Sequence, residues 1–546
     1  MLGFRLCLNP TYERLPQQEP ATLGKGTAMH LTQPVHKGRY ERPGALALVF
    51  RDRRRTFAEL ADRVARLAGA LRGLGVAPGD RVGILAQNSD RYVEALFAVW
   101  WAGGAVNPVN TRWSADEVAY SLDDCDTRVL LVDDTFAPVA GALKERSRAL
   151  RTLVHMGDGP APEGMPGCEA LIEAAEPAAD AMRGGDDLAA ILYTGGTTGL
   201  PKGVMLTHGN LYANALSTIA ATPRPERSVG LQVAPLFHVG GIGPVMQYAL
   251  RLATQVILPG FTPPAVLQAV AAEKVTEVFL VPTMLKQVIE HPEFANHDTS
   301  SLRLVLYGAA PIDGTLLDRA MAAFPGAGFA QVYGMTELAP VVTVLGEWWH
   351  TADGRAAGKL ASAGRPVPLA DVRVVDVDGQ ELPPGRAGEI VARGANVMAG
   401  YWNKPEETAA ALRGGWMHTG DVGFMDGDGF LFVVDRIKDM IVSGGENVYS
   451  AEVENVILEV PAVSSCAVIG VPDETWGERV HAVIVARNGM AVDADAVIAH
   501  CKARIAGYKC PRSVEFRTEM PLSPAGKLLK FKLREPYWEG RSRRVS

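Results

Sequence analysis

The chain has 546 residues, and 47% of them are hydrophobic, which is enough to fill the cores of at least two domains. The 54 basic and 61 acidic residues give a formal net charge of −7 without a long basic run, which excludes a surface that follows a nucleic-acid backbone. The six cysteines lack the paired spacing of a zinc or redox site, so we expect reduced thiols in a cytoplasmic protein.

The N-terminal segment 1–28 carries arginines but no sustained apolar stretch, which argues against a secretory signal. We expect this extension to be disordered and without function, and the folded chain to begin near Met29. No apolar run reaches the roughly 18 residues that a transmembrane helix needs. The nearest run, 95–106, contains Gly103 and Gly104 and is expected to be a buried helix that ends at glycine.

Helix and strand patterns alternate along the first part of the chain. Thr56 and Glu59 have the spacing of a capping box, and apolar residues continue at helical intervals up to Gly73. Short apolar runs at 81–85 and 127–132 are typical of buried strands. This alternation predicts a layered α/β architecture.

Residues 193–203, Tyr-Thr-Gly-Gly-Thr-Thr-Gly-Leu-Pro-Lys-Gly, gather glycines, hydroxyls and one lysine in a loop that suits a polyphosphate. Glycine lets backbone N–H groups approach an anion, and the hydroxyls and the lysine add donors. With a strand expected at 187–192 and a helix at 206–219, we predict the order strand, loop, helix. A Walker A loop is excluded because proline precedes Lys202 and glycine follows it. The alternative is a surface loop without a ligand.

Four further blocks follow this loop. They are 331–337 (Gln-Val-Tyr-Gly-Met-Thr-Glu), 418–421 (His-Thr-Gly-Asp), 435–454, which begins Asp-Arg-Ile-Lys-Asp, and 524–527 (Pro-Ala-Gly-Lys). In this order they closely resemble the adenylate-forming (ANL) superfamily of acyl-CoA synthetases, coumarate ligases, luciferases and peptide-synthetase adenylation domains. The resemblance covers about Thr56 to Lys530. It implies an α/β fold with a large multi-sheet AMP-binding domain over 29–434 and a smaller mobile α+β lid domain over 435–546.

The resemblance also implies an AMP-forming ligase that uses ATP, Mg²⁺ and coenzyme A. Attack of a carboxylate on the α-phosphorus of ATP brings two anions together, so cations and oriented donors must offset their repulsion. Lys527 matches the family lysine that bridges the carboxylate and the α-phosphate. Thr336 matches the threonine at the α-phosphate, and Glu337, assisted by Thr194, would hold Mg²⁺. The alternatives are an exposed turn lysine and a solvated acid.

The same resemblance assigns the nucleotide contacts. Tyr333 would stack on adenine, and Asp421 would hold the ribose hydroxyls with Arg436 beside it. The alternatives are core packing for Tyr333 and a helix N-cap for Asp421. The complete predicted ATP- and AMP-binding set is Thr194, Gly195, Gly196, Thr197, Thr198, Gly199, Lys202, Gly308, Ala309, Ala310, Tyr333, Gly334, Thr336, Asp421, Arg436 and Lys527. One departure from the family loop is Gly195, where serine is common, and it removes one hydroxyl contact to phosphate.

The catalytic lysine would occupy the approach that the attacking thiol needs, and the family solves this by rotating its C-terminal domain. Asp435 and Lys438 match the family hinge, with an ordinary linker turn as the alternative. Glycine in the following loop would leave room for the pantetheine arm of coenzyme A. The predicted thioester loop is Gly444, Gly445 and Glu446.

Amino-acid-activating relatives carry an aspartate within the segment that corresponds to 235–241, and this chain has none there. The predicted acyl pocket is therefore neutral and apolar, with a histidine as gate or wall rather than as base. Its predicted members are Phe237, His238, Val239, Gly241, Thr283 and Leu285. A medium- or long-chain fatty acid is the expected substrate, and an aryl acid such as ferulate or benzoate is the alternative.

Too few residues follow the last block to form a carrier-protein domain, so free coenzyme A is the expected acceptor. The remaining alternatives are acyl transfer to a separate carrier protein, a luciferase-like oxygenase and a non-catalytic nucleotide-binding module. The expected partners are the carboxylic acid, ATP and coenzyme A. Homodimer formation and peripheral contact with a membrane stay open.

Overall fold

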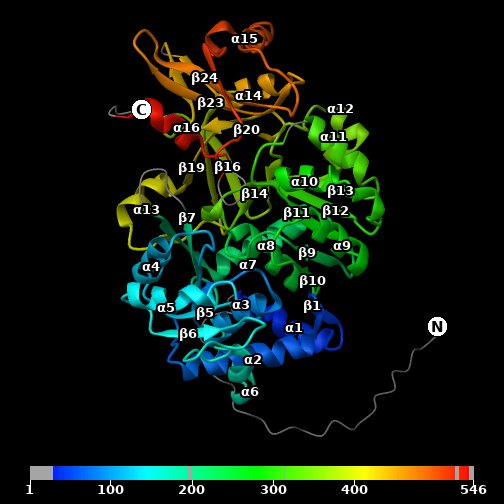
Figure 1. Cartoon of the computed structure of the whole chain (residues 1–546), viewed down its shortest axis with the longest axis vertical. Coiled ribbons are helices and arrows are strands. Elements are labelled where there is room, and N and C mark those ends of the chain that lie inside the picture. The colour runs from blue at the N-terminus through cyan, green and yellow to red at the C-terminus, as the bar shows by residue number, and fades with distance from the viewer. Residues whose placement is uncertain (1–28, 195–199, 313, 445, 523–527, 540–546) are drawn as a thin grey trace, which may run out of the picture.

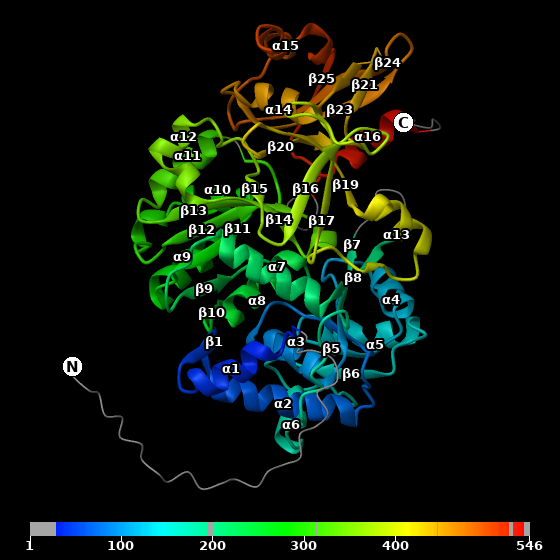
Figure 2. The same ribbon diagram turned by 180° about the vertical axis from the view of Figure 1, so that it is seen from behind.

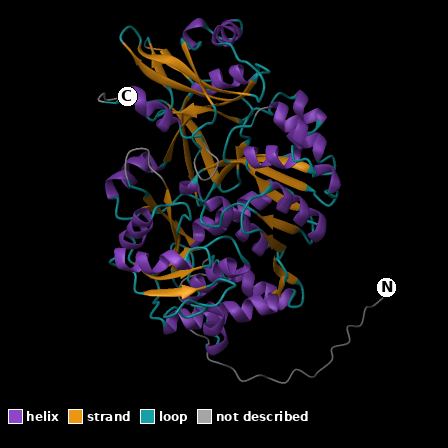
Figure 3. Ribbon diagram, in the orientation of Figure 1, coloured by secondary structure: helices purple, strands orange, loops and turns teal. Residues whose placement is uncertain are grey.

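The computed structural model describes residues 29–194, 200–312, 314–444, 446–522 and 528–539, and Figure 1 shows their arrangement. Three sheets and their helices form the large part of the molecule. The elements from α14 (Ser450–Leu458) onward gather at one end of it, as the view from behind also shows (Figure 2). Helices flank the strands throughout (Figure 3), so the predicted α/β class with a smaller C-terminal unit is confirmed.

Nine described strands form the first sheet in the order β15-β14-β13-β12-β11-β9-β10-β1-β2. The run from β13 to β1 is parallel, and parallel strands need cover on both faces, which explains their apolar sequences. Their bounds are β1 (Leu46–Phe50), β2 (Arg53–Thr56), β9 (Val229–Gln232), β10 (Thr254–Ile257), β11 (Glu277–Leu280), β12 (Leu304–Gly308), β13 (Gly328–Gly334), β14 (Val341–Leu345) and β15 (Arg365–Pro366).

The second sheet carries the glycine-rich loop and has the order β18-β8-β7-β4-β3-β5-β6. Its strands are β3 (Arg81–Leu85), β4 (Ala105–Pro108), β5 (Thr127–Val132), β6 (Thr152–His155), β7 (Leu188–Thr194), β8 (Lys202–Thr207) and β18 (Gly400–Tyr401). The predicted order strand, loop, helix is wrong, because β8 pairs antiparallel with β7 and the helix begins only at His208. Cross-strand hydrogen bonds on both sides of β8 override the helical pattern that begins at Leu206.

A third sheet and a C-terminal sheet complete the strands. The third sheet has the order β16-β17-β19-β20, with β16 (Ala370–Val375), β17 (Gly388–Gly394), β19 (Met417–Met425) and β20 (Leu431–Arg436). The C-terminal sheet contains β21 (Ile441–Ser443), β22 (Glu446–Val448), β23 (Val463–Asp473), β24 (Gly477–Ala486) and β25 (Ser513–Arg517). The sequence analysis placed the domain boundary between residues 434 and 435. Strand β20 ends at Arg436, so it extends two residues beyond that boundary.

The helices begin and end where the sequence signals are strong. Helix α2 starts after Thr56, whose side chain forms the predicted capping box with Glu59, and α3 ends at Gly103 in the left-handed region. The other α-helices are α1 (Gln33–Glu41), α4 (Ala115–Asp124), α5 (Ala137–Arg146), α6 (Cys168–Ala174), α7 (His208–Ala221), α8 (Val239–Leu250), α9 (Pro263–Glu273), α10 (Pro282–Ile289), α11 (Gly314–Ala323), α12 (Ala352–Ala356), α13 (Pro405–Ala411), α15 (Ala494–Lys502) and α16 (Lys530–Trp538), with α2 over Phe57–Gly73 and α3 over Asp90–Ala102. Short 3₁₀ turns occupy Phe294–Asn296, Thr336–Leu338, Glu347–His350, Arg413–Gly415 and Gly507–Lys509.

The five cysteines of the described residues are buried and form no disulfide with one another. None of the described helices has the length and apolar character needed to cross a membrane.

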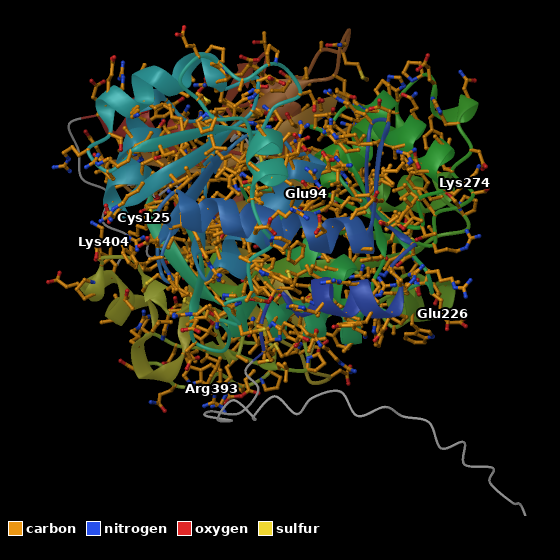
Figure 4. The ribbon with its side chains drawn as sticks, turned by 90° about the horizontal axis from the view of Figure 1, so that it is seen from below. Glu94, Cys125, Glu226, Lys274, Arg393 and Lys404 are labelled. Atoms are coloured by element: carbon orange, nitrogen blue, oxygen red, sulfur yellow. The ribbon has the colours of Figure 1, made fainter. Side chains whose placement is uncertain are left out.

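Helices α2 and α3 are joined by a buried ion pair. Glu94 on α3 is 1% exposed, and its carboxylate accepts hydrogen bonds of 2.6 and 2.9 Å from Arg63 on α2. Burial raises the pKa of Glu94, and the guanidinium of Arg63 opposes this rise. In the view from below, Glu94 is labelled near the middle of the molecule and Lys274 at its edge (Figure 4). Arg55 lies 3.8 Å from the same carboxylate, so Arg63 is the closer of its two cations.

We expect Arg63→Ala to lower the free energy of unfolding by about 3–5 kcal/mol, because it leaves Glu94 buried and without its closer cation. Lys274→Ala is the matched control: its pair with Asp298 is 63% and 52% exposed, so the expected loss is below about 1 kcal/mol. Urea unfolding followed by tryptophan fluorescence checks both. Equal losses for the two variants would contradict the structural role of the buried pair.

Candidate functional site

The glycine-rich loop joins the ends of the β7–β8 hairpin. Thr194 is the last residue of β7 and pairs with Lys202, the first residue of β8. The Thr194 hydroxyl lies 3.5 Å from the Lys202 carbonyl oxygen. The predicted phosphate contacts Gly195, Gly196, Thr197, Thr198 and Gly199 lie outside the described residues. The hairpin therefore fixes the two ends of the predicted phosphate loop rather than its centre.

Glu337 lies beside this hairpin although 135 positions separate it from Lys202 in the sequence. It follows β13 in a 3₁₀ turn and is 7% exposed, so the alternative of a solvated acid is wrong. The Tyr401 hydroxyl donates a 2.9 Å hydrogen bond to its carboxylate. The ammonium of Lys202 lies 5.3 Å from the centre of the same tyrosine ring. Strand β18 thus brings the predicted metal-binding acid and the predicted phosphate-binding lysine together.

Two buried asparagines hold the turn that carries Glu337. Asn214 on α7 donates to the carbonyls of Leu338 and Val341 at 3.1 and 2.6 Å, and Asn396 donates to the same two at 2.9 and 3.3 Å. Residues that bridge two carbonyls from two sides limit the freedom of the turn. The backbone next to Thr336 and Glu337 is therefore fixed from both sides.

The predicted nucleoside contacts also come together. The Tyr333 hydroxyl donates a 2.7 Å hydrogen bond to Asp421, and the Arg436 guanidinium lies 3.3 Å from the other carboxylate oxygen. Asp421 lies inside β19, so the alternative of a helix N-cap is wrong. Burial, and then the charge of Asp421, raise the pKa of Tyr333 well above its usual range, so this hydroxyl stays protonated as a donor.

Gly308, Ala309 and Ala310 lie at the carboxyl end of β12, next to β13. Gly308 pairs with Val332, and a Cβ at Gly308 would come within 2.1 Å of the Val332 carbonyl oxygen, so only glycine permits this approach. Ala309 adopts a φ of +64°, which non-glycine residues rarely do. Ligands of open α/β sheets bind at the carboxyl ends of parallel strands, and this strained backbone lies at such an edge. Gly334 closes the group, because a Cβ there would lie 1.8 Å from the Pro340 carbonyl oxygen.

The predicted acyl pocket is only partly assembled. Phe237 and Val239 are each 7% exposed and flank His238, whose ring lies 4.4 Å from that of Phe237. Leu285 is a correction: it is fully buried in the core cluster that contains Val305. Residue 305 alternates with Leu306 along β12, so the two side chains lie on opposite faces of the sheet.

The glycines of α8 differ in how much room the surrounding atoms leave for a side chain. A Cβ at Gly241 would come within 2.3 Å of the Pro235 carbonyl oxygen, so this glycine serves a close backbone approach and leaves no room for substrate. A Cβ at Gly240 would meet only Phe279, at 3.9 Å. Thr283 is exposed in the first turn of α10, at the carboxyl edge of β11. Gly241 is therefore required by a close backbone approach, whereas the described residues leave room for a Cβ at Gly240.

The predicted hinge residues differ in their surroundings. The Asp435 carboxylate accepts hydrogen bonds from the backbone N–H and, at 2.7 Å, from the hydroxyl of Ser450, the first residue of α14. Lys530 donates to that hydroxyl at 2.5 Å and pairs with Glu454 at 2.7 Å. Asp435 thus belongs to β20 by its backbone and to the C-terminal unit by its side chain. Lys438 follows in the turn, and burial lowers its pKa.

Gly444 of the predicted thioester loop has a φ of +62° and donates its N–H to the Trp476 carbonyl at 2.9 Å. A Cβ there would lie 2.7 Å from the indole ring, which already explains the glycine. Glu446 is exposed in β22, whereas Gly445 and the predicted catalytic Lys527 lie outside the described residues. Leu522 and Leu528, on either side of the segment with Lys527, pair in an antiparallel bridge.

The donors at the site suit Mg²⁺. Thr194 and Glu337 offer one hydroxyl and one carboxylate, and the described residues contain no group of three or more His, Cys, Asp or Glu that could hold a metal. Mg²⁺ is commonly bound by one or two carboxylates together with substrate phosphates and water. A carboxylate in a buried setting beside a phosphate-binding hairpin therefore fits a metal that arrives with the nucleotide.

Tyr401 contacts the predicted site but is not among the residues that the sequence predicts for it. The residue lies in a two-residue strand, so neither a helical nor an alternating pattern marks it. The only local signal is an aromatic pair after glycine, followed by proline and two acids, in 400–407. Its partners are remote in sequence, and only the folded chain reveals them.

Asp421→Ala should weaken AMP binding about 10- to 100-fold, because it removes the charged acceptor expected for the ribose hydroxyls and leaves the Tyr333 hydroxyl without its acceptor. Calorimetric titration with AMP measures the change. Asp371→Ala is the control in the same sheet, since its pair with Arg393 is 63% and 54% exposed. Unchanged AMP affinity in the Asp421 variant would remove the ribose assignment.

Comparisons with known proteins agree with this geometry. The family model "AMP-binding enzyme" matches residues 36–402, and "AMP-binding enzyme C-terminal domain" matches 452–527. The chain is 44% identical to a feruloyl-CoA synthase from an Amycolatopsis species, over 92% of this chain and 98% of that one. It is 36% identical to the long-chain-fatty-acid–CoA ligase FadD13 of Mycobacterium tuberculosis, over 89% and 94% of the two chains.

Among solved structures, the anthranilate CoA ligase AuaEII in complex with anthranoyl-AMP superposes with a TM-score of 0.86 at 28% identity, covering 94% of this chain and 98% of that one. Both family models match in the expected order; Thr194, Lys202, Glu337 and Tyr401 lie within the first match, whereas Asp421 and Arg436 lie between the two matches. The chain therefore belongs to the AMP-binding enzyme family of the adenylate-forming superfamily, and it is an ATP-dependent acid–thiol ligase.

Proposed function

We propose that the chain is an aryl-acid–CoA ligase. It joins an aromatic carboxylic acid to AMP with release of pyrophosphate, and then transfers the acyl group to the thiol of coenzyme A with release of AMP. The single observation that carries the aryl acid is the 44% identity, over 92% of this chain, to a relative named feruloyl-CoA synthase. Gly240 faces Phe279 in an apolar part of the first sheet, which fits a neutral acyl group. We therefore propose the aryl acid, which was the alternative in the sequence analysis, in place of the expected fatty acid.

The proposed acyl slot lies between α8 and one face of β11, β12 and β13. Phe279, Leu306 and Val332 belong to one apolar cluster on this face, and Gly240 approaches Phe279. A Cβ at Gly240 would make only one ordinary contact, so packing against the described residues does not require glycine at this position. We therefore replace Leu285 and Gly241 in the predicted pocket by Phe279, Leu306 and Val332.

Gln247 gives this slot a polar end. Its Nε2 atom lies 4.0 Å from the position of a Cβ at Gly243, one turn along α8. Arg224 offers only donors and bonds to Gln247 Oε1 at 2.7 Å, so Nε2 is directed away from it. Gln247 is 5% exposed, and Arg224 is itself paired with the buried Glu277. A fixed amide donor at the far end of an apolar slot favours an aryl acid with a ring oxygen.

In the first half-reaction, a carboxylate oxygen of the acid attacks the α-phosphorus, a P–O bond forms, and the bond to the pyrophosphate oxygen breaks. Lys527 and Lys202 would offset the negative charge that gathers there, and Thr336 would donate to the α-phosphate. Mg²⁺ would neutralise phosphate charge when bound at Glu337 and Thr194. The buried Asp421–Tyr333 pair would hold the nucleoside in place.

In the second half-reaction, the thiolate of coenzyme A attacks the acyl carbon, and AMP leaves with the electrons of the broken C–O bond. Lys527 must move away for this attack, so we propose that the unit after β20 rotates about Lys438. The proposed domains are 29–434 and 435–546, with the boundary two residues before the end of β20. The loop with Gly444, Gly445 and Glu446 is the proposed thioester face.

Lys527→Ala should lower acid-dependent exchange of pyrophosphate into ATP by about 100- to 1,000-fold, because one preorganised donor to the α-phosphate is lost. Thioester formation from a supplied acyl-adenylate should remain. Lys532→Ala, an exposed lysine of α16, is the control and should exchange at the normal rate. Normal exchange in the Lys527 variant would refute its catalytic role.

Coenzyme A-dependent AMP formation should have a higher kcat/KM for ferulate and 4-coumarate than for octanoate and palmitate. Gln247→Leu should lower kcat/KM for ferulate about 10-fold, because a buried hydrogen bond is lost. Cinnamate has no ring hydroxyl and serves as the internal control, with a change below about twofold. A preference for palmitate would overturn the aryl-acid proposal, and equal losses on ferulate and cinnamate would remove the role of Gln247.

A further inference from the structure

Tyr401 contacts both charged groups of the proposed polyphosphate site. Its hydroxyl donates to Glu337 at 2.9 Å, and its ring lies 5.3 Å from the Lys202 ammonium. A phenol hydroxyl facing a carboxylate oxygen at this distance acts as the donor.

The backbone around Tyr401 is held on both sides. Strand β18 pairs Tyr401 with Val204 of β8, and Trp402 donates its N–H to the Gly203 carbonyl at 2.7 Å. The Thr408 hydroxyl accepts a 2.9 Å hydrogen bond from the Tyr401 N–H. The tyrosine is thus attached to the same hairpin that carries Lys202, while its hydroxyl reaches the turn after β13.

Each contact has a distinct physical effect. A hydrogen bond to one oxygen of a carboxylate fixes its rotation, and residues that orient a metal ligand commonly affect metal affinity by about 10- to 100-fold. A cation over the face of an aromatic ring is attracted by the ring's π electrons, which restricts where the ammonium lies. One side chain therefore orients the acid and the lysine relative to each other.

We propose that Tyr401 is a positioning residue that aligns Glu337 for Mg²⁺ through its hydroxyl and Lys202 for the ATP phosphates through its ring. The inference rests on the proposed function, which supplies the roles of Glu337 and Lys202. It adds a residue from a strand that no motif of the sequence marks. It also separates two contributions of one side chain, and two substitutions can distinguish them.

The experiment measures equilibrium binding of α,β-methylene-ATP by calorimetry, once with Mg²⁺ and once with EDTA. This analogue is not cleaved between its α- and β-phosphorus atoms, so the readout is independent of turnover. Tyr401→Phe keeps the ring and should reduce the gain in affinity from Mg²⁺ about 10-fold or more, with the affinity in EDTA unchanged. Tyr401→Leu should also weaken binding in EDTA, by about 2- to 5-fold.

Two further variants make the result specific. Tyr212→Phe removes a hydroxyl that bonds to Gln33 at 2.8 Å away from the site, and it should behave as the unaltered protein. The double variant Tyr401→Phe with Glu337→Gln should lose no more of the affinity gained from Mg²⁺ than Glu337→Gln alone, because the hydroxyl acts through that carboxylate.

A full Mg²⁺ gain in Tyr401→Phe, or an independent further loss in the double variant, would overturn the proposal for the hydroxyl. Equal affinities of Tyr401→Phe and Tyr401→Leu in EDTA would overturn the proposal for the ring. Absence of any Mg²⁺ gain in the unaltered protein would instead contradict the proposed function, so the two failures are distinguishable.

Discussion

The site depends on the need to bring two anions together. A carboxylate approaches a triphosphate only where fixed cations and donors offset the repulsion, and such groups act more strongly when water is excluded. As proposed, Lys202 and a metal held by Glu337 would meet this need; Glu337 is buried, accepts a hydrogen bond from Tyr401, and has Lys202 over the ring of the same tyrosine. The protein then has to hold these groups still, because a carboxylate that rotates freely would bind metal and nucleotide less well.

The supporting structure comes from three sheets. The second sheet carries Lys202 on its hairpin, the first sheet leads into Glu337 after β13, and the third sheet supplies Asp421 from β19. Side chains connect these sheets: Tyr401 reaches Glu337, and Tyr333 reaches Asp421. A distortion in one sheet would therefore misplace groups that are proposed to contact the same nucleotide. This arrangement explains why so large a scaffold surrounds a small site.

Side-chain contacts hold the chain on both sides of Lys438, where it passes from β20 into the C-terminal unit. Asp435 caps α14 through Ser450, and Arg534 of α16 donates to Asp439 at 2.7 Å, so the unit is well anchored to the segment just after β20. Arg436 and Asp421 still pair across β20 and β19. The proposed rotation about Lys438 would break the hydrogen bonds between Asp435 and Ser450, which lie on opposite sides of this turn.

The sequence alone determined the fold class, the capping of α2, the end of α3 at Gly103 and the reaction class, because these depend on local patterns and on ordered motifs. It did not reveal that β8 intervenes between the loop and α7, since that segment has a mixed pattern whose outcome is decided by pairing with β7 and β18. The sequence also could not show on which face of the sheet a side chain lies. For that reason Leu285 was predicted in the acyl pocket, although it is buried in the core. The partners of Tyr401 are 64 and 199 positions away, so only the tertiary structure could bring them together: contacts between remote strands leave no periodic signal in the chain.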